Sequence, residues 1–317
     1  MVDLNIKLPE SFFQEEERDG YLVSAKTKEL WAVQLDLVNE LDRVCKKYGI
    51  KYMLDFGSLL GAIRHNGFIP WDDDLDVSML REDYDKLMEI GPTEFKHPYF
   101  LQNHYTDKNY SDCITKLRRS DTTFIMAVDV SPRYKLKYNK GIFIDIFVFD
   151  NVTSVDKNAT DAITAVKNDY IHCWQVVSRI PKFLFDLKFP ARLLRYAFYR
   201  CKYGDNMNAY MNHEKWAKQL SLTSDYVATC MSPGKPFTRP REWAEVIELH
   251  QFENLILPIP SRYDEILRKR YGNYLKPVRG SSAHSLLYCD TDKSYTEVES
   301  NKELMAKLWK EVLKNNK

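Results

Sequence analysis

The chain has 317 residues, of which 44% are hydrophobic, enough for one large domain or for a core with an added lobe. Its 46 lysines and arginines balance 45 aspartates and glutamates, and the net charge of +1 argues against a protein that coats nucleic acid. The N-terminus lacks a basic segment followed by an apolar one, and no stretch reaches the roughly 20 apolar residues of a membrane span. We therefore expect a cytoplasmic protein without a signal peptide.

The six cysteines are widely spaced and include no C-x-x-C pair. Reduced thiols, as in other cytoplasmic proteins, are the expected state. The alternative is a zinc site assembled from Cys173, Cys201, Cys230 and a histidine.

The first half of the chain alternates helices and strands. Apolar spacing and capping residues predict, in order, a helix over 26–48 ended by Gly49, a strand over 50–54, a short helix over 59–64 capped by Ser58, a strand over 74–80, a helix over 81–90 ending at Gly91, and strands over 99–102, 114–118, 122–126 and 141–149. This half, residues 26–150, reads as a mixed α/β core, and residues 1–25 read as an acidic N-terminal arm.

Residues 151–317 change in character and predict a mostly helical part. Long amphipathic stretches cover 157–180 and 184–203, and a final helix covers 296–315. The expected fold class is therefore α+β, with a mixed sheet core, flanking helices and a mostly helical C-terminal half.

Three aspartates predict a metal site. Asp74 and Asp76 stand one residue apart at the predicted strand "DLDVSML", and residues i and i+2 of a strand point to the same side. Two such carboxylates repel each other unless a cation lies between them, and Mg²⁺ favours this kind of oxygen site. Asp145, inside the apolar strand "GIFIDIFVF", would complete a platform for phosphoryl transfer. Asp72 and Asp73 are interpreted as a solvated loop edge.

Neighbouring residues fit the binding of a phosphorylated substrate. Gly57 and Ser58 open a short helix, whose first amides can bind phosphate. Arg64, and Arg118 in the basic run "KLRR", can add charged hydrogen bonds to phosphate oxygens. Trp71 stands beside the acids, where it would either wedge the acidic loop or contact a cationic ligand group.

A longer set of motifs resembles the LicD family of phosphotransferases, which includes the fukutin-related proteins. The motifs, in order from about residue 47 to 275, are "YMLDFGSLLGAIRHNGFIPWDDDLDVSMLREDYDKL", "KLRRSDTTF", "GIFIDIFVFD" and "FENLILPIPSRYDEILRKRYGNYL". The resemblance implies a nucleotidyltransferase fold like that of DNA polymerase β and places the metal ligands at Asp74, Asp76 and Asp145. It also implies Mg²⁺- or Mn²⁺-dependent transfer of phosphocholine, or of another phospho-alcohol such as ribitol phosphate, from a CDP-alcohol to a hydroxyl of a surface glycan, teichoic acid or lipopolysaccharide precursor.

In this hypothesis Asp74 and Asp76 hold the metal on the donor diphosphate, and Asp145 draws the proton from the acceptor hydroxyl. The stretch 178–204 is basic and aromatic, so it would lie either on the inner face of an anionic membrane, near a lipid-linked acceptor, or against the protein core.

Two other functions remain open at this point. One is a glycosyltransferase that uses its D-x-D to hold a sugar nucleotide, although the Gly-Ser step and the third aspartate disfavour it. The other is a non-catalytic nucleotide-binding protein, which the intact set of acids disfavours.

Overall fold

The structure is a computed structural model and describes residues 1–110, 112–130, 137–177, 189–220, 223–232, 235–278 and 286–315. The helices of these residues are η1(Glu10–Phe13), α1(Ala25–Tyr48), α2(Phe56–His65), α3(Arg81–Glu94), α4(Lys157–Val177), α5(Phe189–Tyr203), α6(Asn206–Gln219), α7(Glu242–Glu245), α8(Tyr263–Tyr271), α9(Tyr295–Ser300) and α10(Lys302–Asn315). The strands are β1(Glu16–Arg18), β2(Tyr21–Val23), β3(Met53–Leu54), β4(Asp76–Leu80), β5(Tyr99–Gln102), β6(Thr115–Arg119), β7(Thr123–Met126), β8(Ile142–Val152), β9(Tyr226–Ala228), β10(Thr238–Pro240), β11(Ile247–Phe252), β12(Leu255–Pro260) and β13(Leu286–Asp290).

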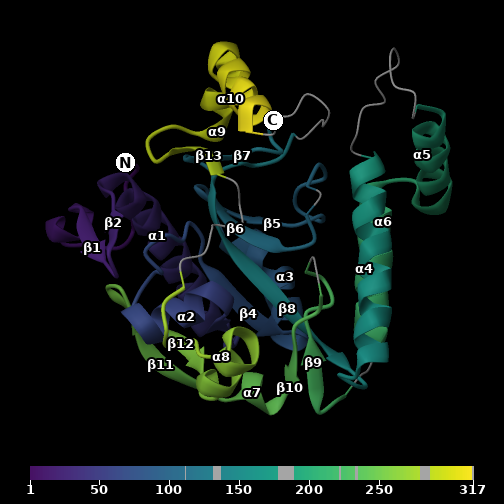
Figure 1. Ribbon diagram of the computed structural model, residues 1–317, viewed down its shortest axis with the longest axis horizontal. Helices are drawn as coiled ribbons and strands as arrows, with labels where there is room; N and C mark the ends of the chain where they lie inside the picture. Colours follow the sequence, from purple (N-terminus) through teal and green to yellow (C-terminus); the bar gives the residue numbers. More distant parts are fainter. Residues whose placement is uncertain are drawn as a thin grey trace.

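The long strand β8 organises a mixed seven-stranded sheet. Along one edge it pairs with β4 in parallel. Along the other edge its first half pairs antiparallel with β6, and its last residues pair antiparallel with β9. Strand β3 extends the sheet beyond β4, β5 extends it beyond β6 and β10 extends it beyond β9; Figure 1 labels β5 and β10. The first half of β8 is therefore paired with a strand from the first half of the chain, and its last residues are paired with a strand from the second half.

The two faces of β4 and β8 differ in chemistry because successive side chains point to opposite faces. One face is apolar and packs in the main core together with residues of α1, among them Leu37 and Leu41; its members are Val77, Met79, Ile144, Ile146 and Val148. The other face starts with Asp76 and Asp145 and becomes aromatic toward Phe149. The sheet thus carries its acids on the face that α1 does not cover.

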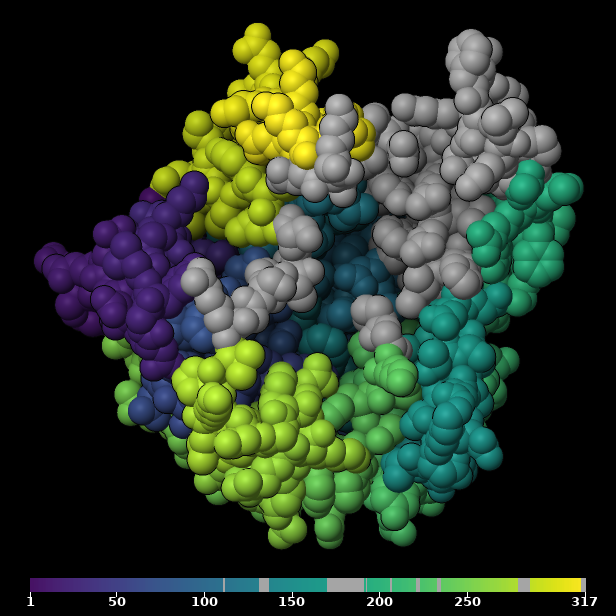
Figure 2. Space-filling model, in the orientation of Figure 1, coloured from purple at the N-terminus to yellow at the C-terminus, as the bar shows by residue number. Residues whose placement is uncertain are grey.

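The N-terminal residues pack onto this core. The amide of Asn5 donates to Asp36 of α1, and Arg18 of the β1–β2 hairpin pairs with Glu253. The space-filling view shows these residues in purple, with the yellow C-terminal helices above and α8 below, around the sheet (Figure 2).

Most predicted elements of the first half are present, and three predicted helices, two of them in this half, need correction. Helix α2 begins at Phe56 with Asp55 as its N-cap, so Ser58 lies inside the helix and does not cap it. Helix α3 continues past Gly91 to Glu94. The predicted final helix divides into α9 and α10, since Asn301 interrupts it.

The half predicted to be mostly helical also contains strands. Strands β9 and β10 continue the main sheet, β11 and β12 form a hairpin, and β13 pairs with β7. Most of these strands are too short, at three to six residues each, to give a clear alternating pattern in the sequence. Within the described residues, no helix is both long and apolar enough to cross a bilayer.

Candidate active site

Three carboxylates converge where β4 begins. Asp76 and Asp145 are directly paired residues of the parallel strands β4 and β8, and Asp74 lies two residues before Asp76. One carboxylate oxygen from each of the three lies within 4.8 Å of the other two. Asp76 and Asp145 are only 8% and 2% exposed. The arrangement matches what Mg²⁺ takes from a protein, a few carboxylate oxygens with positions left for water and phosphate. The structure thus brings together the three aspartates that the sequence predicts as metal ligands.

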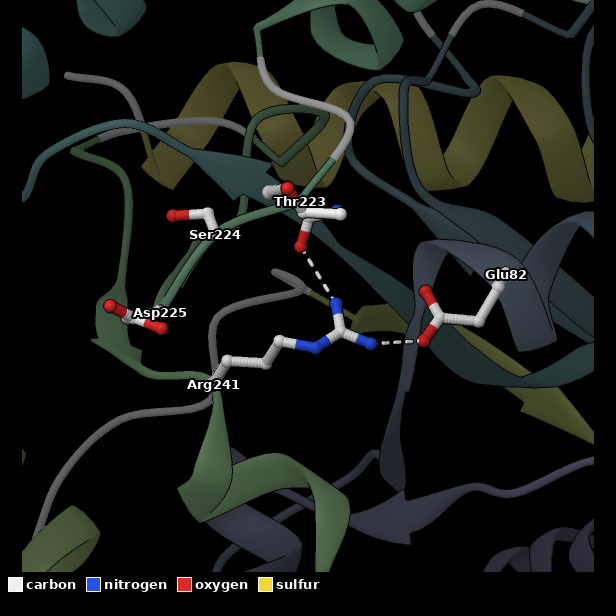
Figure 3. A pocket seen from close by; sticks show the side chains of 6 residues that line it. Glu82, Thr223, Ser224, Asp225 and Arg241 are labelled. Atoms are coloured by element: carbon white, nitrogen blue, oxygen red, sulfur yellow. Dashed lines mark hydrogen bonds and ion pairs between the residues drawn. The ribbon is translucent and has the colours of Figure 1, made fainter.

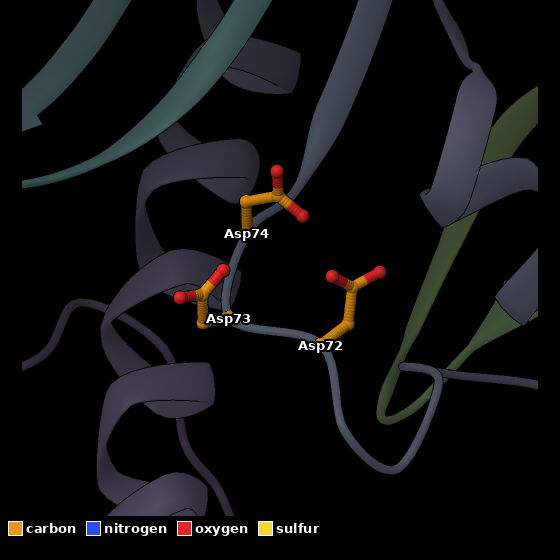
Figure 4. A group of neighbouring side chains, drawn as sticks. All are labelled: Asp72, Asp73 and Asp74. Carbon is orange, nitrogen blue, oxygen red and sulfur yellow. The ribbon is translucent and has the colours of Figure 1, made fainter. Parts of the chain in front are cut away.

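Asp72 and Asp73, which the sequence predicts as a solvated loop edge, are half-buried loop residues and form a second carboxylate group that shares Asp74 with the first. A carboxylate oxygen of Asp72 lies within 4.8 Å of oxygens of Asp73 and Asp74. Figure 4 shows the carboxylates of Asp72 and Asp74 turned into the same space. Burial, together with the charge of Asp74, raises the pKa of Asp72 to about 8. The signal in the sequence was the repeated spacing of two from Asp72 through Asp74 to Asp76.

Helix α1 fixes the backbone of this acidic loop. The indole N–H of Trp31 donates to the carbonyl oxygen of Asp72 at 3.1 Å, and the side-chain amide of Gln34 donates to that of Asp73 at 2.8 Å. Trp31 is itself stacked on Phe68, with ring centroids 4.7 Å apart. Both anchors are buried in α1 and contribute no metal ligand. Sequence reasoning missed them because they lie about 40 residues away from the loop.

Lys116 gives Asp145 a partner. The two residues oppose each other on β6 and β8, and the Lys116 ammonium donates to a carboxylate oxygen of Asp145. Lys116 is 2% exposed and also lies over the ring of Phe143. A buried cation next to three acids offsets part of their mutual repulsion. The basic run "KLRR" was the sequence signal, but it pointed to phosphate binding and not to Asp145.

The start of α2 faces the carboxylates. The hydroxyl of Ser58 accepts the backbone N–H of Asp76 at 2.8 Å, which ties the helix to the first residue of β4. A Cβ added to Gly57 would lie 2.9 Å from Oδ2 of Asp72 and 4.0 Å from Oδ2 of Asp76. Gly57 therefore leaves room for two carboxylates beside the first turn of the helix.

A buried arginine links the N-terminus of α2 to the sheet. Arg239 of β10 is fully buried and donates to Oδ2 of Asp55, the N-cap of α2, at 2.9 Å. The hydroxyl of Ser78 donates to the same oxygen at 2.7 Å. Arg239 also lies 3.9 Å from the ring centroid of Phe149. The N-cap, β4 and β10 are therefore joined by one hydrogen-bonded group.

Of the other predicted substrate-binding residues, Arg64 and Arg118 lie farther from the acids along their elements, and Trp71 adjoins the acidic loop. Arg64 lies in the last turn of α2, where its Nη1 donates to the carbonyl of Tyr274 at 3.4 Å and where burial lowers its pKa. Arg118 is buried in β6 and donates to the carbonyl of Gly141 at 2.6 Å. Trp71 is half-buried next to the acidic loop and meets the ring of Tyr21 edge to face.

The alternative zinc site gains no support from the described residues. Their side chains form two candidate metal clusters, both made of carboxylates alone. Cys230 is buried and Cys201 is exposed, while the side chain of Cys173 lies outside the described part.

A separate cavity of 620 Å³ lies at the other end of the central strands (Figure 3). Its lining includes Glu82, Asn151, Ser224 and Arg241. Asn151 comes six residues after Asp145 on β8, or about 20 Å at the usual strand rise. Arg241 is already bonded to Glu82 and to Asn151. This cavity is therefore distinct from the acidic site.

The fold and the site define an α/β protein with a carboxylate cluster on the open face of a mixed sheet, a class that fits metal-dependent chemistry on phosphates. Residues 49–172 match the family described as LicD/FKTN/FKRP, nucleotidyltransferase domain. Over 259 residues the chain is 26% identical to the lipopolysaccharide cholinephosphotransferase LicD of Haemophilus influenzae, covering 78% of this chain and 91% of that protein.

The ribitol 5-phosphate transferases FKRP of mouse and human are 50% identical over 51 residues, which is 16% of this chain and 10% of theirs. The resemblance that the motifs predict is confirmed: residues 49–172 carry a LicD-family domain.

Proposed function

We propose that this protein is a Mg²⁺-dependent phosphotransferase that moves phosphocholine, or a related phospho-alcohol, from a CDP-alcohol to a hydroxyl of a cell-surface glycan or its lipid-linked precursor. The observation that carries the proposal is the convergence of Asp74, Asp76 and Asp145 within 4.8 Å beside the first turn of α2. The names of the relatives support it, since one transfers cholinephosphate and another ribitol 5-phosphate.

The donor set suits a hard divalent cation, because it consists of carboxylate oxygens without nitrogen or sulfur. Asp74, Asp76 and Asp145 would hold the metal, with Asp72 at its edge. When bound, Mg²⁺ or Mn²⁺ neutralises charge on the donor phosphates and orients them for in-line attack. The amide of Phe56 already donates to Asp55, so the amides of Gly57 and Ser58 in the first turn of α2 would bind phosphate oxygens.

Asp145 is the proposed acceptor of the proton from the attacking hydroxyl. A general base must be ionised, and the ion pair with Lys116 favours the ionised carboxylate. One oxygen of Asp145 accepts a hydrogen bond from Lys116. Lys116 would thus position Asp145, which would serve as the base and, with Asp74 and Asp76, as a metal ligand.

The test is a donor screen with product analysis. CDP-choline, CDP-ethanolamine, CDP-glycerol and CDP-ribitol are compared for protection of the protein against heat, with Mg²⁺ and with EDTA. One of these donors should protect only with the metal and should release CMP when an acceptor glycan is supplied. Release of UDP from a UDP-sugar would instead identify a glycosyltransferase, and a protein that binds nucleotide without turnover would be non-catalytic.

Helix α5 supports an additional proposal, that the protein contacts an anionic membrane where a lipid-linked acceptor lies. Leu194 and Phe198, one turn apart, are 73% and 57% exposed, whereas Tyr199 on the opposite face is 6% exposed. Arg195 and Arg200 lie on the two sides of the apolar stripe, since residues advance by about 100° along a helix. An outer face that is apolar with basic flanks is typical of helices that lie in a membrane interface. Residues 178–188 of the predicted basic segment are outside the described part.

A further inference from the structure

The last turn of α8 places a guanidinium on an aromatic surface at the start of α2. The Cζ of Arg270 lies 4.5 Å from the ring centroid of Phe56 and 5.0 Å from that of Phe237. Those two rings contact each other edge to face with centroids 6.0 Å apart. The Nε of Arg270 donates to the hydroxyl of Tyr271 at 3.1 Å. Stacking on rings orients a guanidinium plane without using the hydrogen bonds of its two Nη atoms.

This guanidinium borders the carboxylate cluster. Phe56 directly precedes Gly57, whose Cα faces the carboxylates of Asp72 and Asp76. Arg270 and Tyr271 therefore lie at the rim of the site, although they follow Asp76 by almost 200 residues.

Arg270 differs from the other arginines of its helix region in lacking an acidic partner. Arg268 pairs with Asp264 at 2.7 Å, and Arg262 pairs with Glu265 at 2.7 Å. Within the described residues, Arg270 forms no ion pair, and neither Nη atom donates a hydrogen bond. An exposed guanidinium that is stacked on two rings and forms no ion pair has its charge available for an anion.

We infer that Arg270, held on Phe56 and Phe237, binds the diphosphate of the nucleotide donor on the side opposite the metal ligands. The inference rests on the proposed function and adds to it a residue that no sequence motif had connected with phosphate. If the diphosphate were bound only by the metal ion that the carboxylates hold, the phosphate oxygens on the side away from the metal would keep uncompensated negative charge. The two free Nη groups of an arginine match the spacing of two phosphate oxygens, which a lysine ammonium does not.

The test compares a nucleoside diphosphate with its nucleoside. Binding of CDP and of cytidine, with MgCl₂ present, is measured by calorimetry for the wild type, Arg270→Ala, Arg270→Lys and the control Arg268→Ala. Loss of charged hydrogen bonds predicts CDP binding about 10- to 100-fold weaker in Arg270→Ala, an intermediate loss in Arg270→Lys, and no loss in Arg268→Ala. Cytidine affinity should not change in any variant, and the thermal midpoint of each confirms that it folds.

Wild-type CDP affinity in Arg270→Ala would overturn the inference, and so would equal losses for CDP and cytidine, which would indicate contact with the base. If the wild type binds UDP and not CDP, the proposed donor is wrong, and the comparison of UDP with uridine still tests Arg270. If the wild type binds neither diphosphate with Mg²⁺, both the proposed function and the role of Arg270 are refuted.

Discussion

Replacing Asp145 by asparagine separates its structural role from its proposed chemical role. The substitution keeps the shape of the side chain but leaves the Lys116 ammonium, 2% exposed, without the carboxylate to which it donates. Removing one partner of a buried ion pair typically destabilises a protein by about 3–5 kcal/mol. Asp74 and Asp76 remain within 4.8 Å of the site of the lost charge, so the lower end, about 3 kcal/mol, is expected.

That loss is measurable in the metal-free protein. At about 2.1 cal/mol/K per residue, the unfolding entropy of this chain is on the order of 0.7 kcal/mol/K, so about 3 kcal/mol lowers the melting temperature by roughly 4–5 °C. The assays are thermal and urea unfolding at pH 7 in EDTA, followed by circular dichroism. Asp72→Asn is the matched control. It should not destabilise, because burial and Asp74 already oppose ionisation of Asp72.

The double variant Lys116→Met, Asp145→Asn should recover most of the lost stability, since the orphaned charge is gone. Transfer activity should not recover and should stay lower by a factor of about 10² or more, as for loss of a general base. If Asp145→Asn is as stable as the wild type, or if the double variant is no more stable than the single one, the ion pair does not have the role assigned to it. Equal losses in donor affinity and in transfer rate would make Asp145 only a metal ligand.

Three further predictions concern Asp72, Gly57 and helix α5. The pKa of Asp72 is about 8 in the folded protein and about 4 in the unfolded chain, so between these pH values the native state keeps a proton that the unfolded chain releases. The free energy of unfolding in EDTA should therefore fall as the pH rises from about 4 to 8. Asp72→Asn should remove this pH dependence, which is measured as the urea midpoint at each pH. Gly57→Ala places a Cβ 2.9 Å from the Asp72 carboxylate and should weaken Mg²⁺-dependent CDP binding about tenfold; unchanged titrations would show that the carboxylate moves freely. The protein should pellet with phosphatidylglycerol vesicles at low salt and be released at high salt, and Leu194→Glu with Phe198→Glu should reduce pelleting; no pelleting of the wild type would assign α5 a purely structural role.

The clustering of the three aspartates could be predicted from the sequence because local patterns carry the necessary geometry. Asp76 and Asp145 stand in apolar strands, and an acid in such a position has to be matched by another charge. The structure pairs these two residues across β4 and β8. Asp74 was grouped with them by strand spacing although it precedes β4, and the convergence is nevertheless observed.

The supporting residues could not be predicted because their contacts depend on the tertiary fold. Lys116 reaches Asp145 only through the β6–β8 register, and Arg239 reaches Asp55 only because β10 joins the sheet at β9. The N-cap of α2 was assigned to Ser58 because both serine and aspartate are good caps. The helix begins earlier because the amide of Leu59 donates to the carbonyl of Asp55, and Phe56 in its first turn has a positive φ of 48°, which no propensity predicts for phenylalanine.

The hydrogen bonds from α1 to the acidic loop have a consequence for how such a site can diversify. Trp31 and Gln34 bind the carbonyl oxygens of Asp72 and Asp73, and every amino acid supplies that same oxygen. The path of the loop is therefore independent of the side chains it presents. Residues there can be exchanged while the backbone keeps its course, so the side-chain chemistry that the loop presents can change without rebuilding the scaffold. The two anchoring side chains, by contrast, have little freedom to change.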